Sequence, residues 1–275
     1  FQTGCAMVTT TGYPKTAHRI TYIHNLFQNG AATLSGLVEM YHERVRRGEI
    51  PAAPEGEETT FIMVTGDGGM DIGMGAALGT ANRNHKMIIL EYDNQGYMNT
   101  GSQLSYATPY GHRTSTSEVG NKLSGKRFHH KDTPQIFAAC NLPYVFTASE
   151  GYPEDFMRKI SKAQWYARRE GFVYGKVLSF CPLNWRTKDD AAQEVLQTAI
   201  DCCFFPLYEV ERGSTHITYD PDAIGRRRSV GAWLGQMGKT KHMLEPDNAE
   251  RLEMLEHEFD KRWRKLKIKS EHPEL

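Results

Sequence analysis

The 275-residue sequence lacks several features that mark whole classes of protein. Its 33 basic and 33 acidic residues cancel, so no charge excess points to a nucleic-acid partner. No apolar stretch approaches the roughly 20 residues that a membrane-spanning helix needs, so we expect no membrane segment. The five cysteines have no even spacing and no secretory segment is visible, which argues against a disulfide framework. We therefore expect a reducing, cytoplasmic setting.

The pattern of apolar residues predicts an α/β fold with a doubly wound, mainly parallel sheet. At 39% hydrophobic and 24% charged residues, the composition is ordinary for a globular protein. Helices are predicted over 31–47, 134–140 and 153–169, and strands over 61–64, 87–90, 144–146 and 177–180. We expect residues 1–205 to form the main domain and residues 206–275, where the composition changes, to form a C-terminal extension that packs on partner subunits.

A phosphate-binding turn is predicted where the first apolar run ends. Thr65 and Gly66 close the run 61–64, which is typical of a buried strand entering a tight turn and puts Asp67 at the carboxyl end of the strand. Small residues follow, beginning with Gly68 and Gly69, so a helix starting here can approach a sheet and a ligand closely. The N-terminus of that helix would offer free amides to phosphate oxygens.

The second apolar run brings a further oxygen ligand to the same edge of the sheet. Residues 87–90 lead into Asp93 and Asn94, one strand-helix-strand unit after Asp67. Mg²⁺ takes roughly six oxygens at about 2.1 Å, and few of them come from protein when phosphates are present. Gly-Asp-Gly alone is often only a turn, but the ordered combination predicts a magnesium diphosphate site, which suits thiamine diphosphate best. The residues alone leave both Asn94 and Asp93 open as the second side-chain ligand.

Further motifs accompany this site. They are Thr3-Gly4-Cys5, Gly66-Asp67-Gly68, Asp93-Asn94-Gln95-Gly96-Tyr97-Met98-Asn99-Thr100-Gly101-Ser102-Gln103, Ala107-Thr108-Pro109, and Cys181-Pro182 with Trp185. Over nearly its whole length the chain resembles the thiamine-diphosphate-binding beta subunit of the 2-oxoacid:ferredoxin oxidoreductases, in particular the pyruvate synthase type. The run 97–103 is the most specific part of the resemblance.

The resemblance implies a role for each motif residue. Asp67 and Asn94 would bind Mg²⁺ by their side chains and Gly96 by its backbone carbonyl, while Asn99 and Thr100 would lie beside the thiazolium ring and the substrate. The remaining cofactor-binding residues would be Gly66, Gly68, Gly69 and Tyr97. The implied reaction is oxidative decarboxylation of a 2-oxoacid, pyruvate by default, to acyl-CoA and CO2, with electrons passed to ferredoxin.

The resemblance also implies a four-iron four-sulfur (4Fe-4S) cluster near the cofactor. In the family, a Cys-x-x-Cys pair, the cysteine of a Thr-Gly-Cys segment and a later cysteine hold it. Cys5 and Cys181 match the last two, and we expect the missing pair upstream of Phe1, since a cubane cluster takes about four thiolates. Cys140, Cys202 and Cys203 are expected to be small buried apolar side chains.

Other subunits are expected to complete the active site, because only one cofactor half-site is recognisable in the sequence. The resemblance implies an alpha subunit that supplies the pyrimidine-facing domain and an activating glutamate, together with gamma/delta-type subunits, ferredoxin and coenzyme A. The basic runs 226–228 and 261–267 are either solvated faces or a docking patch for an acidic ferredoxin.

The loop 99–130 is long enough to suggest a functional role. His112 and Arg113 within it are candidates to pair with a substrate carboxylate, although loop residues of these types usually face solvent. Tyr97, Tyr106 and Tyr110 would suit an aromatic 2-oxoacid such as phenylglyoxylate, or they are packing residues. Two other classes stay open, a non-oxidative thiamine-dependent decarboxylase or synthase and a non-catalytic scaffold.

Overall fold

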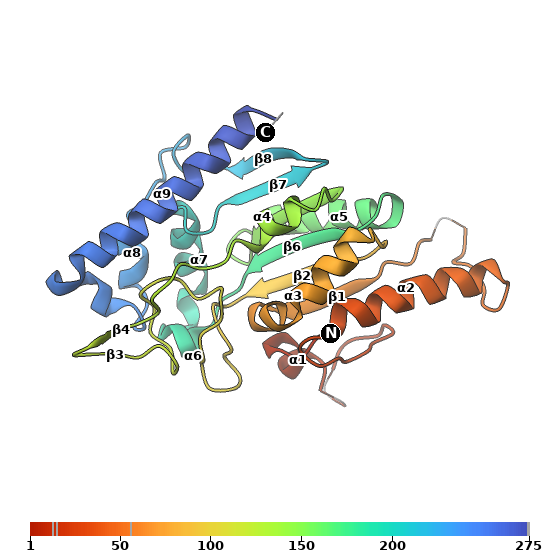
Figure 1. Ribbon diagram of the computed structural model, residues 1–275, viewed down its shortest axis with the longest axis horizontal. Helices are drawn as coiled ribbons and strands as arrows, with labels where there is room; N and C mark the ends of the chain where they lie inside the picture. The colour runs from red at the N-terminus through yellow and green to blue at the C-terminus, as the bar shows by residue number, and fades with distance from the viewer. Residues whose placement is uncertain (13, 15, 56, 274–275) are drawn as a thin grey trace.

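The computed structural model describes residues 1–12, 14, 16–55 and 57–273. A six-stranded sheet with the order β1-β2-β6-β5-β7-β8 forms its centre (Figure 1). The first four strands are parallel, and β7 and β8 are antiparallel to their neighbours, which confirms the predicted mainly parallel α/β fold. The strands are β1 (Ile62–Gly66), β2 (Ile88–Asp93), β5 (Tyr144–Ser149), β6 (Val173–Leu178), β7 (Leu207–Glu211) and β8 (Ser214–Tyr219), with a separate hairpin of β3 (Val119–Gly120) and β4 (Leu123–Ser124).

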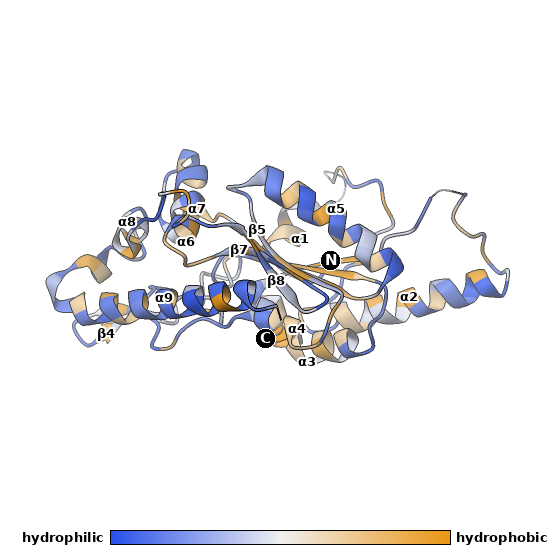
Figure 2. Ribbon diagram, turned by 90° about the horizontal axis from the view of Figure 1, so that it is seen from above, coloured by the Kyte–Doolittle hydropathy of each residue, from blue (hydrophilic) through white to orange (hydrophobic). Residues whose placement is uncertain are grey.

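Helices cover both faces of the sheet. In Figure 2, α5 and α7 lie on one side, and α3, α4 and α9 lie on the other. None of the helices in the described residues is long and apolar enough to cross a lipid bilayer. The helices are α1 (Cys5–Thr10), α2 (Gly30–Arg46), α3 (Asp67–Asn82), α4 (Thr133–Ala138), α5 (Pro153–Arg169), α6 (Pro182–Trp185), α7 (Ala192–Asp201), α8 (Val230–Gly235) and α9 (Ala249–Glu271), with short 3-10 turns η1 (Asp189–Ala191), η2 (Lys241–Leu244) and η3 (Pro246–Asn248).

The central strands are buried on both faces, as parallel strands between two helical layers must be. Every residue of β5 and β6 is buried. On one face, Ala163 and Ala167 of α5 pack in a cluster with Phe146. On the other, Val38 of α2 and Ala77 of α3 join the core against the sheet. Small side chains on α3 allow it to lie close to β1 and β2, which fixes the position of its first turn.

The strand that leads to Cys181 differs from its predicted range. It was expected over 177–180, but β6 runs from Val173 to Leu178 and pairs with β2 as far as Asp93. The predicted range is displaced because Lys176 interrupts the apolar run, although its side chain is buried in the structure. Cys181 therefore lies in the connection just before α6 rather than at the strand end.

The predicted boundary at residue 205 falls within one continuous sheet. Strands β7 and β8 follow that boundary, yet β7 pairs with β5. Helix α9 also contributes Trp263 and Leu266 to the same core as β1 and α3. The structure therefore does not separate residues 206–275 from the main domain, because two of its strands extend the sheet. That these residues contact partner subunits stays a prediction.

Candidate cofactor-binding site

A pocket of about 110 Å³ lies where β1 and β2 end. It brings together the N-terminal segment, the start of α3 and the loop that follows β2. The pocket contains every predicted cofactor-binding and catalytic residue except Cys181. Its lining is Thr3, Gly4, Cys5, Val8, Phe27, Gly66, Asp67, Gly68, Gly69, Tyr92, Asn94, Gly96, Tyr97, Met98, Asn99 and Thr100.

The register of two strands explains why distant residues meet there. Strands β1 and β2 pair in parallel, and the last partners are Gly66 and Tyr92. Asp67 follows β1 directly as the first residue of α3, and Asn94 follows β2 directly. Because the carboxyl ends of neighbouring parallel strands lie at one edge of the sheet, both side chains reach the same pocket.

Three oxygens converge in the pocket. The side-chain oxygen of Asn94 lies 3.2 Å from Oδ1 of Asp67 and 3.0 Å from the backbone oxygen of Gly96, and it faces only acceptors. If the amide were turned over, its NH2 group would donate to both oxygens. In the present orientation the three oxygens form the donor set of a cation. Neighbouring ligands of an octahedral Mg²⁺ at 2.1 Å are about 3.0 Å apart, so this donor set fits Mg²⁺.

Asp93 has other partners. Its Oδ2 lies 3.0 Å from Nζ of Lys176, and its Oδ1 accepts a hydrogen bond from the backbone of Gln95 at 2.8 Å. Asp93 also lines a larger cavity of about 430 Å³ between α4 and α9, which contains none of the residues assigned to the cofactor. Both of its carboxylate oxygens therefore have partners already, and the geometry favours Asn94 over Asp93 as the second ligand.

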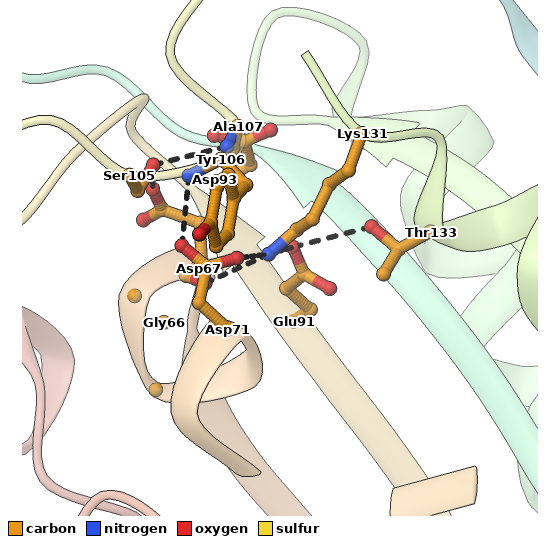
Figure 3. Close-up of polar contacts among 12 residues, drawn as sticks. Gly66, Asp67, Asp71, Glu91, Asp93, Ser105, Tyr106, Ala107, Lys131 and Thr133 are labelled. Carbon is orange, nitrogen blue, oxygen red and sulfur yellow. Dashed lines mark hydrogen bonds and ion pairs between the residues drawn. The ribbon is translucent and has the colours of Figure 1, made fainter. Parts of the chain in front are cut away.

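A layer of buried charge lies behind the pocket (Figure 3). Nζ of Lys131 donates to the backbone oxygen of Asp67 at 3.0 Å, pairs with Asp71 and lies 3.9 Å from Glu91. Four carboxylates and two ammonium groups share this layer, and the charge of the nearby Lys126 acts on three of the carboxylates. The members of this layer are Asp67, Asp71, Glu91, Asp93, Lys131 and Lys176.

The surroundings of Asp67 disfavour its ionised form when no cation is bound. Burial, followed by the nearby charge of Asp93, raises the pKa of Asp67 well above its ordinary value. A hydrogen bond from the hydroxyl of Ser105 and the charge of Lys131 lower the pKa in part. A buried carboxylate of this kind either takes up a proton or pairs with a cation. Asp67 is therefore suited to hold a metal ion.

Two glycines are required by close contacts at the site. A Cβ at Gly68 would lie 2.4 Å from the ring of Tyr97, whose hydroxyl donates to the backbone oxygen of Gly68 at 2.9 Å. A Cβ at Gly96 would lie 2.7 Å from the backbone oxygen of Gln103. Burial raises the pKa of Tyr97 to about 12, so its hydroxyl keeps its proton at neutral pH.

The two predicted catalytic residues lie at the exposed rim of the pocket. Asn99 and Thr100 are both exposed. The hydroxyl of Thr100 donates to Oε1 of Gln103 at 2.5 Å, and this bond ties the rim to the loop that follows. Both side chains are therefore accessible to a substrate or to another subunit.

Comparisons with known proteins identify the family. Residues 3–174 match the family model described as the C-terminal TPP-binding domain of thiamine pyrophosphate enzymes. Pyruvate synthase subunit PorB of Thermotoga maritima is 40% identical over 96% of this chain and 79% of its own length. Its namesake in Methanocaldococcus jannaschii is 39% identical over 89% of this chain and 80% of its own length. The chain belongs to the beta-subunit family of 2-oxoacid:ferredoxin oxidoreductases.

A relative and a solved structure with other names are also similar to the chain. Ketoisovalerate oxidoreductase subunit VorB of Pyrococcus abyssi is 31% identical over 96% of this chain and 81% of its own length. A solved 2-oxoglutarate:ferredoxin oxidoreductase from Magnetococcus marinus is 24% identical and aligns over 58% of this chain and 47% of that chain, with a TM-score of 0.46. Membership confirms the predicted family, the thiamine-diphosphate-binding fold and the thiamine-dependent enzyme class.

The two cysteines that match the cluster pattern of the family occupy different places, Cys5 in the pocket and Cys181 just before α6. Cys5 lines the pocket, and its thiol is one of the groups that raise the pKa of Cys181, after burial as the main cause. A cubane cluster takes about four thiolates, so two cysteines alone could not hold one. Within the described ranges, no three His, Cys, Asp or Glu side chains gather into a metal site. Cys202 and Cys203 are buried as expected, whereas Cys140 is partly exposed.

His112 and Arg113 do not reach the pocket of this family member. His112 is 0% exposed, packs against Trp233 with the rings tilted, and has no partner for either ring nitrogen among the residues that the structure describes. Arg113 is partly exposed and lies 3.3 Å from Glu118. The loop turns inward here, since the backbone of Gly111 donates to the carbonyl of Lys126. The predicted contact with a substrate carboxylate therefore has no support in this geometry.

The structure adds site residues that sequence reasoning missed. Trp185 was noted only as part of a motif, yet its Nε1 donates to the backbone oxygen of Asn94 at 2.9 Å. Nζ of Lys239 donates to Oε1 of Gln95 at 2.6 Å, and burial lowers the pKa of Lys239 to about 7. Lys131 and Lys176 were also missed. No local pattern marks these residues, because each acts on a segment far away in the sequence.

Proposed function

We propose that the chain is the catalytic beta subunit of an enzyme that oxidatively decarboxylates a 2-oxoacid, forms acyl-CoA and CO2, and passes two electrons to ferredoxin. The observation that carries the proposal is the convergence of the oxygens of Asp67, Asn94 and Gly96 in a pocket of a chain of this family. Pyruvate is the default substrate because the relatives named pyruvate synthase reach 40% identity. The relative named ketoisovalerate oxidoreductase supports a test of branched 2-oxoacids as well.

In this proposal Mg²⁺ is held by the side chains of Asp67 and Asn94 and by the carbonyl of Gly96. The first residues of α3, Gly68 and Gly69, offer backbone amides to the diphosphate, where the helix dipole favours negative charge. Thiamine diphosphate, when bound, supplies a carbanion for the keto carbon and accepts the charge left by departing CO2. The layer behind the site keeps Asp67 in place through the bond from Lys131.

Asn99 and Thr100 are proposed to border the thiazolium ring and the substrate, because they form the exposed rim of the pocket. Tyr97 supports them by fixing the start of α3 through its bond to Gly68. We assign the pyrimidine-facing domain and the activating glutamate to an alpha subunit. The gamma/delta-type subunits, coenzyme A and ferredoxin complete the proposed assembly, which we place in the cytoplasm.

Cys5 and Cys181 are proposed to be two ligands of a 4Fe-4S cluster. The position of Cys5 in the pocket supports an electron exit beside the cofactor. Such a cluster needs two more thiolates.

The test is anaerobic purification of the native complex, with iron, acid-labile sulfide and thiamine diphosphate measured against this chain. Thiamine diphosphate with roughly four irons per chain beyond those of other subunits would support the oxidoreductase. Thiamine diphosphate without that iron would overturn the oxidoreductase proposal and indicate a non-oxidative enzyme. CoA-dependent CO2 release from pyruvate, 2-oxoisovalerate and phenylglyoxylate then ranks the substrates.

A further inference from the structure

We propose that Lys239 is a positioning residue that holds the metal-binding loop, residues 93–97, in the shape that brings Asn94 and Gly96 together. Lys239 lies between α8 and η2, 144 residues beyond the side chain that it contacts. The inference rests on the proposed function, because the loop matters only if Mg²⁺ binds there. It gives the C-terminal part of the chain a role in cofactor binding.

The loop adopts a backbone conformation that needs support. Gln95, which lies between the two proposed ligands, has a φ of 71°. This left-handed region is uncommon for residues that carry a Cβ. The turn at Gln95 leaves the side-chain oxygen of Asn94 3.0 Å from the carbonyl oxygen of Gly96. A change at Gln95 would therefore separate two of the three proposed metal ligands.

Contacts to Gln95 hold this turn from several sides. Its backbone NH donates to Asp93 at 2.8 Å, and its carbonyl accepts from the hydroxyl of Thr108 at 2.6 Å. Its side chain is fully buried, and Oε1 accepts from Lys239 at 2.6 Å. Nε2 has no acceptor within the described part of the chain. Within those residues, Lys239 thus makes the only hydrogen bond of this side chain.

Lys239 and Trp185 act on consecutive residues of the loop. Nζ of Lys239 lies 4.8 Å from the centre of the Trp185 ring, whose Nε1 donates to the carbonyl of Asn94 at 2.9 Å. The backbone of Lys239 is itself fixed, since its carbonyl accepts from the backbone NH of Arg113 at 3.3 Å. The two side chains form one support for the loop.

The burial of Lys239 is hard to explain by stability alone. The residue is 2% exposed, and no carboxylate of a described residue lies within ion-pair distance of its Nζ. Burying a lysine amine without a carboxylate partner is costly and lowers its pKa, although Cys181, Asp93 and Asp67 oppose that lowering, so an apolar side chain would favour the fold more. A lysine at this position is instead explained by its bond to Gln95 and its contact with Trp185, because both act on the metal-binding loop.

The experiment measures Mg²⁺ affinity in the purified complex, by titrating Mg²⁺ at saturating thiamine diphosphate and following cofactor binding by circular dichroism. Lys239→Met removes the bond to Gln95 at similar volume. Removing a residue that holds a metal ligand in place typically weakens metal binding about 10–100-fold, and we expect a loss in this range with kcat restored at saturating Mg²⁺. Lys241→Met is the matched control, because Lys241 is exposed and two residues away, and it should match the wild type.

Gln95→Asn provides an independent variant. Asn tolerates a positive φ, but its shorter side chain cannot keep the bond to Lys239. It should weaken Mg²⁺ binding to a similar extent, and the double variant should be no weaker than the poorer single variant. Should Lys239→Met fail to fold, the affinity of Gln95→Asn decides the question.

The outcomes separate the inference from the proposed function. A wild-type complex that shows no Mg²⁺-dependent cofactor binding overturns the proposed function itself. A wild type that binds Mg²⁺, with Lys239→Met or Gln95→Asn binding equally well, overturns the positioning role. If metal-free Lys239→Met has a lower melting temperature but an unchanged Mg²⁺ affinity, Lys239 stabilises the fold and does not position the metal-binding loop.

Discussion

Replacement of Lys176 by methionine is expected to destabilise the fold strongly. Its Nζ lies 3.0 Å from Asp93 and 3.2 Å from Glu91, and it donates to Thr133 at 3.0 Å. All four residues are buried, and methionine fills a similar volume. Removing one partner of a buried ion pair costs about 3–5 kcal/mol, because the remaining charge stays buried without compensation. Native stability is about 5–15 kcal/mol, so the loss is a large fraction of it.

The loss should depend on pH. Burial raises the pKa of Glu91, but Lys176 and then Lys131 outweigh it and hold that pKa below its ordinary value of 4.5. Glu91 therefore stabilises the wild type above pH 4.5, and this contribution disappears as the pH falls through the depressed value. Without Lys176, burial should raise the pKa of Glu91, so the variant loses stability as the pH rises. The difference between the two proteins should be widest near neutral pH and should shrink toward pH 4.5.

Urea denaturation of the metal-free protein at several pH values provides the measurement. Lys261→Met is the control, because Lys261 also pairs with a carboxylate, Glu258, but its side chain is 49% exposed. Pairs that water reaches contribute about 0–1 kcal/mol, so the control should lose much less stability. A difference between Lys176→Met and wild type that is the same at every pH would refute the electrostatic reasoning and indicate lost packing instead.

Three further predictions concern the pocket. Asp67→Ala should remove both bound thiamine diphosphate and turnover, measured by cofactor content and CO2 release, whereas retained turnover would indicate a non-catalytic scaffold. Gly96→Ala should weaken Mg²⁺ binding in a titration, because its Cβ would lie 2.7 Å from a backbone oxygen, and a wild-type affinity would argue against the carbonyl as a ligand. Mg²⁺ affinity should fall as the pH is lowered, because burial raises the pKa of Asp67 and protons compete with the metal, so an affinity that does not change as the pH falls from neutral would contradict that role.

Much of the site could be predicted because its ligands are local to strand ends. The apolar runs before Asp67 and Asn94 indicate strands, and parallel strands bring their carboxyl ends to one edge. The helix over 153–169 was predicted with the bounds of α5 because its start carries Pro153 and its apolar residues recur at helical spacing. The motif residues 97–100 also reach the pocket, since they follow β2 within a few residues.

The sequence by itself therefore determined the α/β class, the order of the main helices and strands from α2 to β6 and the edge of the sheet at which the cofactor pocket forms, since these depend on periodicity and on short spacings. Only the tertiary structure decided that Asn94 rather than Asp93 faces Asp67, because Lys176 of another strand holds Asp93. It also decided that His112 is buried and that Lys239 reaches Gln95. Such contacts join residues far apart in the chain. A local sequence pattern cannot predict them, because only the packing of the whole fold brings these residues together.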